Sequence, residues 1–141
     1  MTAVENVRLP APTILVIDDA HIARMHARRA LSGAGFAVVE AADGHEGLMQ
    51  LRRHPEIGLV FCDMNMPRMN GIEFLEWVKA TPGLAVPHVV MLTAEMLPNL
   101  VQTAKHLGVR SWLRKPCHPA LIVATANAIV GAQRSSPEQM T

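Results

Sequence analysis

The feature that most constrains the fold is a regular alternation of short apolar runs with longer amphipathic stretches. The apolar runs predict strands at residues 13–18, 36–42, 57–63, 87–95 and 109–115. The amphipathic stretches predict helices at about residues 20–35, 43–54, 70–81, 98–108 and 119–132. Continuously apolar strands are typical of a sheet buried on both faces, and strands that alternate with helices favour parallel pairing. The sequence therefore predicts an α/β fold with a five-stranded, doubly wound parallel sheet, although the pattern does not give the strand order.

Several residues bound these predicted elements or define their buried faces. Asp43 is expected to begin the second helix, and Pro55 is expected to end it. Pro98 suits the first position of the fourth helix. The apolar residues of the first helix are Ile22, Met25, Ala30 and Leu31. The residues of the third helix expected to face inward are Ile72, Phe74, Leu75 and Val78.

Length and composition allow one domain. The chain has 141 residues and is 50% hydrophobic, which is enough for one compact core. We expect a leader over residues 1–12, the domain over residues 13–132 and a flexible polar tail over residues 133–141. A net charge of +1 argues against a nucleic-acid or membrane-surface binder. No apolar run is long enough to span a bilayer, and the N-terminus lacks the apolar core of a signal peptide. The two cysteines suggest reduced thiols, so we expect a cytoplasmic protein.

Polar side chains collect where the predicted strands end. The first strand ends in Asp18 and Asp19, the third in Asp63, the fourth in Thr93 and Ala94, and the fifth in Lys115 and Pro116. Ligands bind outside the carboxyl ends of the strands in open parallel sheets. The sequence therefore predicts a site with three carboxylates, a hydroxyl and an ammonium group.

The chemistry of such a set indicates phosphoryl transfer. Clustered carboxylates repel one another and require a divalent cation, and oxygen ligands suit Mg²⁺ or Mn²⁺. The backbone carbonyl of Asn65 could add a neutral ligand. A carboxylate such as Asp63 can act as a nucleophile toward phosphorus, while Lys115 and Thr93 could neutralise and bond the phosphoryl oxygens.

Four short motifs in register resemble the receiver domain of two-component response regulators. They are VIDD (16–19), DMNMPRMNG (63–71), LTAE (92–95) and LRKP (113–116), and the resemblance extends from Thr13 to about Gly131. It implies a flavodoxin-like fold with strand order 2-1-3-4-5. It also implies a phosphoprotein of a phosphorelay that signals rather than acts as an enzyme on a separate substrate.

The resemblance assigns a role to each residue of the predicted site. Asp63 matches the phosphate acceptor, which takes its phosphoryl group from a histidine kinase or a histidine phosphotransfer protein. The metal ligands would be Asp18, Asp19, Asp63 and the backbone carbonyl of Asn65. The residues that bind phosphate or switch with it would be Thr93, Ala94, Lys115 and Trp112, where Trp112 stands in the place of a smaller aromatic residue. The Lys115–Pro116 peptide bond is expected to be cis.

The last predicted helix is unusual because no charged residue lies between Lys115 and Arg134. A helix that packs on a sheet normally carries charge on its outer face. A helical count turns Ile122, Ala126, Ile129 and Val130 toward the sheet. We expect an exposed apolar interface for a downstream protein or a second copy of the chain, made of Met96, Leu97, Trp112, Leu121, Val123, Ala124 and Ala128. The alternative is an alanine-rich helix that is merely uncharged.

Other functions remain open at this point. The chain could be a single-domain regulator, the receiver of a longer regulator or hybrid kinase, or a phosphorelay intermediate. A phosphatase of the haloacid-dehalogenase type would need a second acid at the position of Asn65 and a cap domain. A flavin-binding protein would need a glycine- or hydroxyl-rich phosphate loop after the first strand, where this chain has Asp18 and Asp19.

Overall fold

The computed structural model describes residues 11–66 and 68–140, and most of the expected leader (1–10) and Thr141 lie outside these ranges. The strands are β1 (Thr13–Ile17), β2 (Val38–Ala41), β3 (Ile57–Asp63), β4 (His88–Thr93) and β5 (Ser111–Arg114). The helices are α2 (His21–Gly33), α3 (Gly44–Arg53), α4 (Gly71–Ala80), α5 (Pro98–His106) and α6 (Pro119–Met140). Each predicted strand and helix is present, with ends that shift by a few residues.

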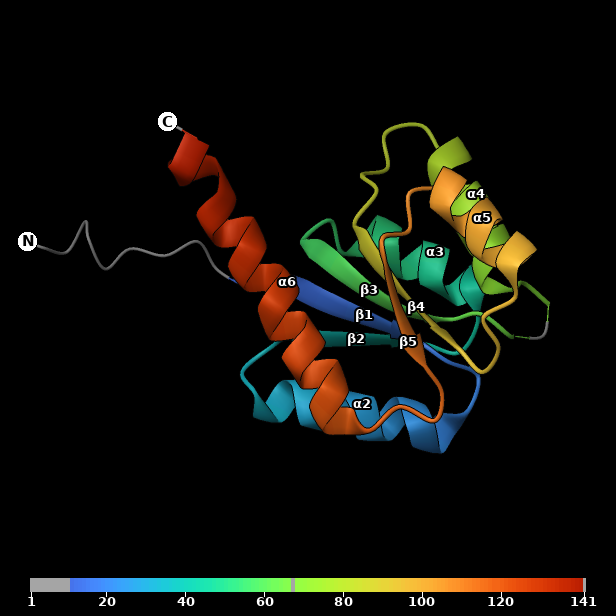
Figure 1. The fold of residues 1–141 in the computed structure, drawn as a ribbon, viewed down its shortest axis with the longest axis horizontal. Coiled ribbons are helices and arrows are strands. Elements are labelled where there is room, and N and C mark those ends of the chain that lie inside the picture. The colour runs from blue at the N-terminus through green and yellow to red at the C-terminus, as the bar shows by residue number, and fades with distance from the viewer. Residues whose placement is uncertain (1–10, 67, 141) are drawn as a thin grey trace, which may run out of the picture.

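The strands form one parallel sheet in the order β2-β1-β3-β4-β5 (Figure 1). This is the flavodoxin-like order that the resemblance implied, and it is confirmed. Consecutive strands run parallel, so each connection must cross the sheet, and a helix makes each crossing. All five strands therefore end at the same side of the sheet, which we call the carboxyl edge.

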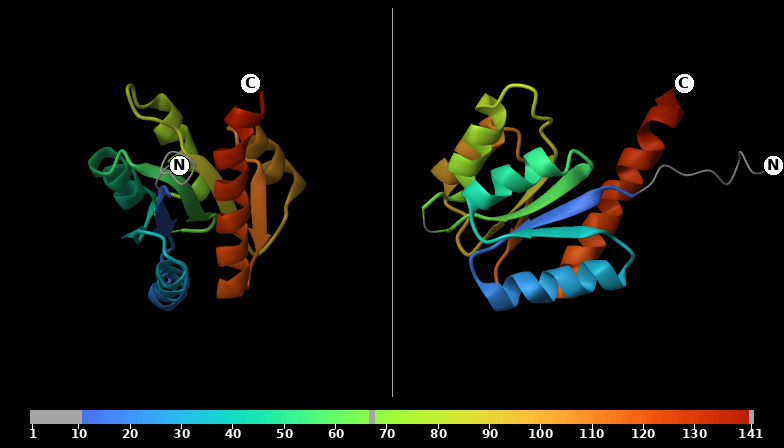
Figure 2. Two further views of the ribbon diagram at one scale, coloured as in Figure 1. Left: turned by 90° about the vertical axis from the view of Figure 1, so that its left-hand side faces the viewer. Right: turned by 180° about the vertical axis from the view of Figure 1, so that it is seen from behind.

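Helices cover both faces of the sheet and enclose two cores. Helices α2 and α6 pack on one face around Leu31, Phe61 and Ala126. Helices α3, α4 and α5 pack on the other face around Leu48, Phe74 and Ala104. Figure 2 shows these two layers from the side and from behind. The doubly wound architecture predicted from the sequence is confirmed.

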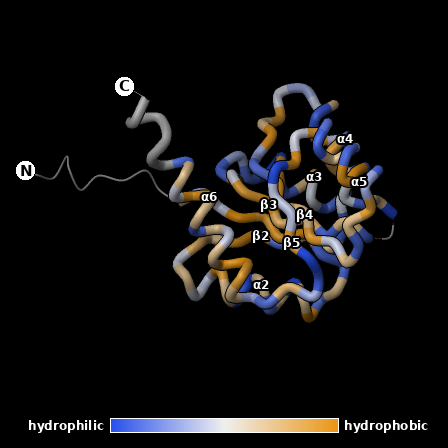
Figure 3. The backbone as a smooth tube through the Cα atoms, in the orientation of Figure 1, coloured by the Kyte–Doolittle hydropathy of each residue, from blue (hydrophilic) through white to orange (hydrophobic). Residues whose placement is uncertain are grey.

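The central strands are apolar because both of their faces are buried. Every residue of β1 is buried, and β3 is buried at all positions except Gly58. Figure 3 shows the hydrophobic residues concentrated along the strands in the middle of the molecule. Burial on both faces explains why these runs lack the polar alternation of a half-exposed strand.

Side chains cap the starts of two helices, of which the Asp43 cap was expected from the sequence. The Asp43 side chain accepts a hydrogen bond from the Glu46 amide at the start of α3. Asn70 and Glu73 form a reciprocal capping box at the start of α4. Gly71 follows directly, and a Cβ there would lie 3.1 Å from the carbonyl oxygen of Asp63. A side chain at this position would therefore push α4 away from the end of β3.

Three details differ from the sequence-based predictions. Ile22 of α2 is 62% exposed, because Ala27 and Leu31 form the buried stripe of that helix. Val123 of α6, expected to point outward, is half-buried and packs against the core below α6. Helix α6 continues to Met140, past Gly131 and Pro137 and through the stretch expected as a loose tail. Among the described residues, no helix is long and apolar enough to cross a membrane.

Candidate functional site

Strand register brings the predicted site residues to one place at the carboxyl edge. Ile17 pairs with Cys62, so the next residues, Asp18 and Asp63, leave adjacent strands at the same level. Thr93 ends β4, and its carbonyl oxygen accepts a hydrogen bond of 2.8 Å from the Lys115 amide. The four motifs, far apart in the sequence, therefore meet because the strands that carry them are neighbours.

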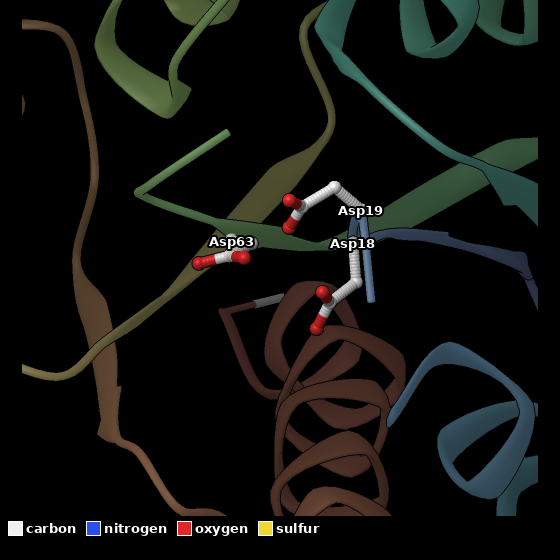
Figure 4. A group of neighbouring side chains, drawn as sticks. All are labelled: Asp18, Asp19 and Asp63. Carbon is white, nitrogen blue, oxygen red and sulfur yellow. The ribbon is translucent and has the colours of Figure 1, made fainter. Parts of the chain in front are cut away.

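The three carboxylates face a common space (Figure 4). One oxygen from each of Asp18, Asp19 and Asp63 lies within 4.8 Å of the others. Asp18 and Asp63 are almost fully buried, at 3% and 2% exposure, whereas Asp19 is exposed. The site thus has a buried floor and one side open to solvent.

Lys115 supplies the positive charge of the site. Its Nζ lies 3.1 Å from Oδ2 of Asp63 and 3.5 Å from Oδ2 of Asp18. Burial works against the charged ammonium, but the two carboxylates outweigh it and raise the pKa of Lys115. Lys115 therefore remains a cation beside Asp63. The Lys115–Pro116 bond is cis, as the resemblance implied.

Burial dominates the electrostatics of Asp63. Loss of solvent raises the pKa of Asp63 to about 6, with a smaller contribution from Asp18, although hydrogen bonds from Lys115 and the Asn65 amide favour its ionised form. Its neighbour Cys62 is fully buried, and burial raises the pKa of that thiol. Cys62 thus has the character of a packing residue.

The cluster suits a divalent cation. When ionised, three carboxylates face one ammonium group, which leaves about two negative charges in a partly buried pocket. All available side-chain ligands are oxygens, the type that Mg²⁺ and Mn²⁺ prefer. The backbone amide of Asn65 donates to Oδ1 of Asp63 at 3.1 Å, which fixes the loop that carries the Asn65 carbonyl.

The Thr93 hydroxyl is engaged away from Asp63 in this structure. It donates to the carbonyl oxygen of Glu95 at 2.8 Å and accepts from the Glu95 amide at 3.3 Å. Ala94 is exposed beside it. Trp112 of β5 is half-buried and packs against the core on the α4 and α5 face.

One arginine of the site was not foreseen from the sequence. Nη1 of Arg24 donates a short hydrogen bond of 2.6 Å to the carbonyl oxygen of Asp18, and its Nε contacts Glu40 at 3.0 Å. Arg28 contacts the other Glu40 oxygen at 2.7 Å. Arg24 therefore ties α2 and β2 to the residue that presents the first carboxylate. Its position on the polar side of an amphipathic helix gave no signal of this role.

The predicted apolar interface is divided between two faces of the sheet. Met96 and Leu97 are 41% and 44% exposed at the start of α5, and Leu121 is 48% exposed on α6. Ala124 and Ala128 are also exposed, whereas Val123 and Trp112 are half-buried. Because α5 and α6 cover opposite faces, a partner that touches both must span the edge strand β5.

The sequence and the fold of this chain are similar to those of known proteins. Residues 14–127 match the family model for the response regulator receiver domain. A probable chemotaxis protein CheY of Rhizobium etli is 35% identical over 120 residues, which cover 84% of this chain and 92% of that protein. The solved structure of chemotaxis protein CheY4 of Vibrio cholerae has a TM-score of 0.78 at 31% identity and covers 85% of this chain and 99% of its own.

A further relative is much longer than this chain. The sensory/regulatory protein RpfC of Xanthomonas campestris is 29% identical over 120 residues, which cover 84% of this chain but 16% of that protein. The same sequence pattern therefore occurs in proteins of about this length and as one part of a larger protein.

Proposed function

Because the chain belongs to the family of response regulator receiver domains, we propose that it accepts a phosphoryl group on Asp63 and thereby changes its contacts with other proteins. The donor is a phosphohistidine on a histidine kinase or a histidine phosphotransfer protein. The observation that carries the proposal is the buried Asp63 carboxylate beside Asp18, Asp19 and Lys115. In this role the chain is a signalling module rather than an enzyme with a separate substrate.

The residues of the site divide the work of phosphoryl transfer. A carboxylate oxygen of Asp63 attacks the phosphorus, the phosphorus–nitrogen bond of the donor breaks, and the leaving imidazole keeps its electron pair. Lys115 lies next to Asp63 and neutralises charge on the phosphoryl oxygens. Mg²⁺ or Mn²⁺, held by Asp18, Asp19, Asp63 and the Asn65 carbonyl, supplies further charge neutralisation when bound.

Thr93 connects the site to the surface. Its hydroxyl has one proton, which it now donates to the Glu95 carbonyl. Donation to a phosphoryl oxygen on Asp63 would break that bond and release the segment that leads to Met96 and Leu97. We expect Thr93→Ala to accept phosphate but to signal poorly. Trp112 fluorescence is a suitable reporter, since Trp112 packs beneath α5.

The output surface is the exposed apolar set around β5. Met96, Leu97, Leu121, Ala124 and Ala128 would contact a downstream protein or a second copy of the chain. Ala124→Lys and Leu121→Glu test this surface better than a change at Val123, because Val123 also packs against the core. Sedimentation and partner pull-down should show weaker assembly for both variants, whereas unchanged assembly with and without phosphate would exclude this surface.

A second candidate is the same chemistry within a larger protein or relay. The match to one part of the much longer RpfC favours this alternative. In a relay, Asp63 would pass its phosphoryl group on to another histidine. Transfer from the phosphorylated chain to histidine phosphotransfer proteins distinguishes a relay from a terminal output.

The direct test is labelling by a small phosphodonor. The parent chain should become phosphorylated by acetyl phosphate with Mg²⁺ and remain unlabelled with excess chelator. Asp63→Asn should abolish labelling, whereas Glu56→Gln, which changes an exposed carboxylate before β3, should not. A phosphoryl adduct on Asp63→Asn would refute the assignment.

A further inference from the structure

A cavity lies at the end of the sheet opposite Asp63. It has a volume of about 480 Å³ and lies where β4 and β5 begin. The end of α4, the loop before β4, the α5–β5 connection and Gln133 of α6 form its walls. Figure 1 shows the α4–β4 loop and the α5–β5 connection near each other above the start of β5. We call this space the amino-edge cavity.

The polar part of the amino-edge cavity is basic. Lys79, His88 and Arg110 line it, and none of its described lining residues is acidic. The ion pairs found among the described side chains involve neither Lys79 nor Arg110. Within the part of the chain whose side chains the structure describes, Lys79 and Arg110 therefore border this cavity without a carboxylate partner.

Independent observations show that the three basic groups converge. A Cβ at Gly108 would lie 3.9 Å from Nζ of Lys79, which places this ammonium at the α5–β5 connection. Burial, and then the charge of Arg110, lower the pKa of His88. The His88 ring is itself held by Ser111, with 3.1 Å between Nε2 and Oγ. Lys79 and Arg110 thus bring positive charge to the cavity, next to a His88 ring whose lowered pKa favours its neutral form.

Gly108 helps to keep the cavity open. Its φ of +97° is a conformation that other residues rarely adopt. A side chain at this position would also project toward Lys79. The turn therefore carries Arg110 to the same cavity as Lys79 and adds no side chain of its own.

We propose that the amino-edge cavity binds a small organic phosphomonoester. A phosphomonoester carries about −1.5 to −2 charges at pH 7, which Lys79 and Arg110 would balance. The volume of about 480 Å³ falls within the range of roughly 300–1,000 Å³ that small-molecule sites occupy. The body of the ligand would lie against the apolar walls made by Leu75, Val86 and Leu107.

This site is independent of the proposed phosphoacceptor. The carboxyl edge presents Asp18, Asp19 and Asp63 and repels anions unless a cation is bound. The amino-edge cavity has the opposite charge and requires no metal. Binding there can therefore be measured in chelator, where phosphorylation of Asp63 does not occur.

The test is titration calorimetry of the full chain in chelator with AMP, adenosine and inorganic phosphate. AMP combines a phosphomonoester with a planar body, and the other two probes each lack one of these parts. We expect saturable one-to-one binding of AMP with a dissociation constant below about 1 mM, at least tenfold weaker binding of phosphate, and none of adenosine. Amide shifts should appear at Gly108 and Arg110 but not at Asp63.

Variants identify the groups that bind. Lys79→Gln and Arg110→Gln should each weaken AMP binding about tenfold, since each removes one charge-assisted contact. Lys105→Gln, an exposed change on α5 outside the cavity, is the matched control and should bind as the parent does. Circular dichroism verifies that each variant is folded. The proposal is overturned by absent AMP binding at about 10 mM, by adenosine binding as tightly as AMP, or by unchanged affinity in both variants.

Discussion

The two ends of one parallel sheet carry opposite charge by different structural means. At the carboxyl edge, Asp18 and Asp63 are fixed by the ends of paired strands and are 3% and 2% exposed. At the amino-edge cavity, Lys79 and Arg110 are exposed and come from a helix and a loop. The carboxyl edge is thus a largely buried acidic cluster that suits a cation, whereas the amino-edge cavity is an open basic surface that suits an anion.

The largest expected difference between the two ends comes from removal of one ammonium group at each. Lys115→Met should reduce the rate of Asp63 labelling by about 100-fold or more, because a charge placed for the transition state is lost. Lys79→Met should leave the rate unchanged, since Lys79 lies at the other end of the sheet. The measurement is the rate of phosphorylation by acetyl phosphate. Equal phosphorylation rates in the two variants would show that the place of Lys115 beside Asp63 does not speed the reaction.

The buried carboxylate should also lower stability as the pH rises. The folded-state pKa of Asp63 is about 6, above its ordinary value of 3.8, so the folded chain binds more protons between these pH values. Stability from this group is therefore lost as the pH rises from about 4 to about 6. In chelator, Asp63→Asn should be more stable than the parent by up to about 3 kcal/mol at pH 7 and by little at pH 4.

Urea unfolding of both proteins at the two pH values measures this difference. The two chains carry the same other titratable groups, so the difference reports the carboxylate of Asp63 together with its interactions with Lys115 and Asp18. If Asp63→Asn raises the free energy of unfolding equally at pH 4 and pH 7, the raised pKa does not belong to the Asp63 carboxyl group.

A smaller effect is expected from the residue that positions Asp18. Arg24→Ala removes the hydrogen bond to the Asp18 carbonyl and the contact with Glu40. We expect about tenfold weaker Mg²⁺ binding, in the range found for residues that orient metal ligands. Arg29→Ala is the matched control, because Arg29 is exposed on the same helix. If both variants bind Mg²⁺ as the parent does, Arg24 does not position the site.

The smallest effect concerns the basic end of the sheet. Burial and the charge of Arg110 lower the pKa of His88. Arg110→Gln should therefore raise the pKa of His88, which can be followed by NMR of the imidazole protons. The pKa should remain below its ordinary value because burial persists. An unchanged pKa would show that the charge of Arg110 does not act on His88.

The comparison also shows what can be predicted from sequence. Asp18, Asp63, Thr93 and Lys115 directly follow or end apolar runs, and parallel pairing brings all strand ends to one edge. The fold and the carboxyl edge could therefore be derived from local patterns. Residues of the amino-edge cavity follow no local pattern, since four separate segments contribute to it. Only tertiary packing brings Lys79 to the turn at Gly108.

The positions of single side chains on the helices are also hard to predict from the sequence. Ile22 and Val123 were placed wrongly because a helical count gives a face but not which part of it the sheet covers. The contact of Arg24 with the Asp18 carbonyl likewise depends on how α2 packs. The end of α6 was misplaced because a polar composition does not by itself terminate a helix.

The most direct test of the central claim is to map the phosphorylated residue. The parent chain would be incubated with acetyl phosphate and Mg²⁺, digested at low pH, and analysed by tandem mass spectrometry. We predict one phosphoryl group, located on Asp63, which is absent when chelator replaces Mg²⁺. A phosphoryl group on another residue, or labelling of Asp63 that is independent of metal, would contradict the account of the carboxyl edge as a metal-dependent phosphoacceptor.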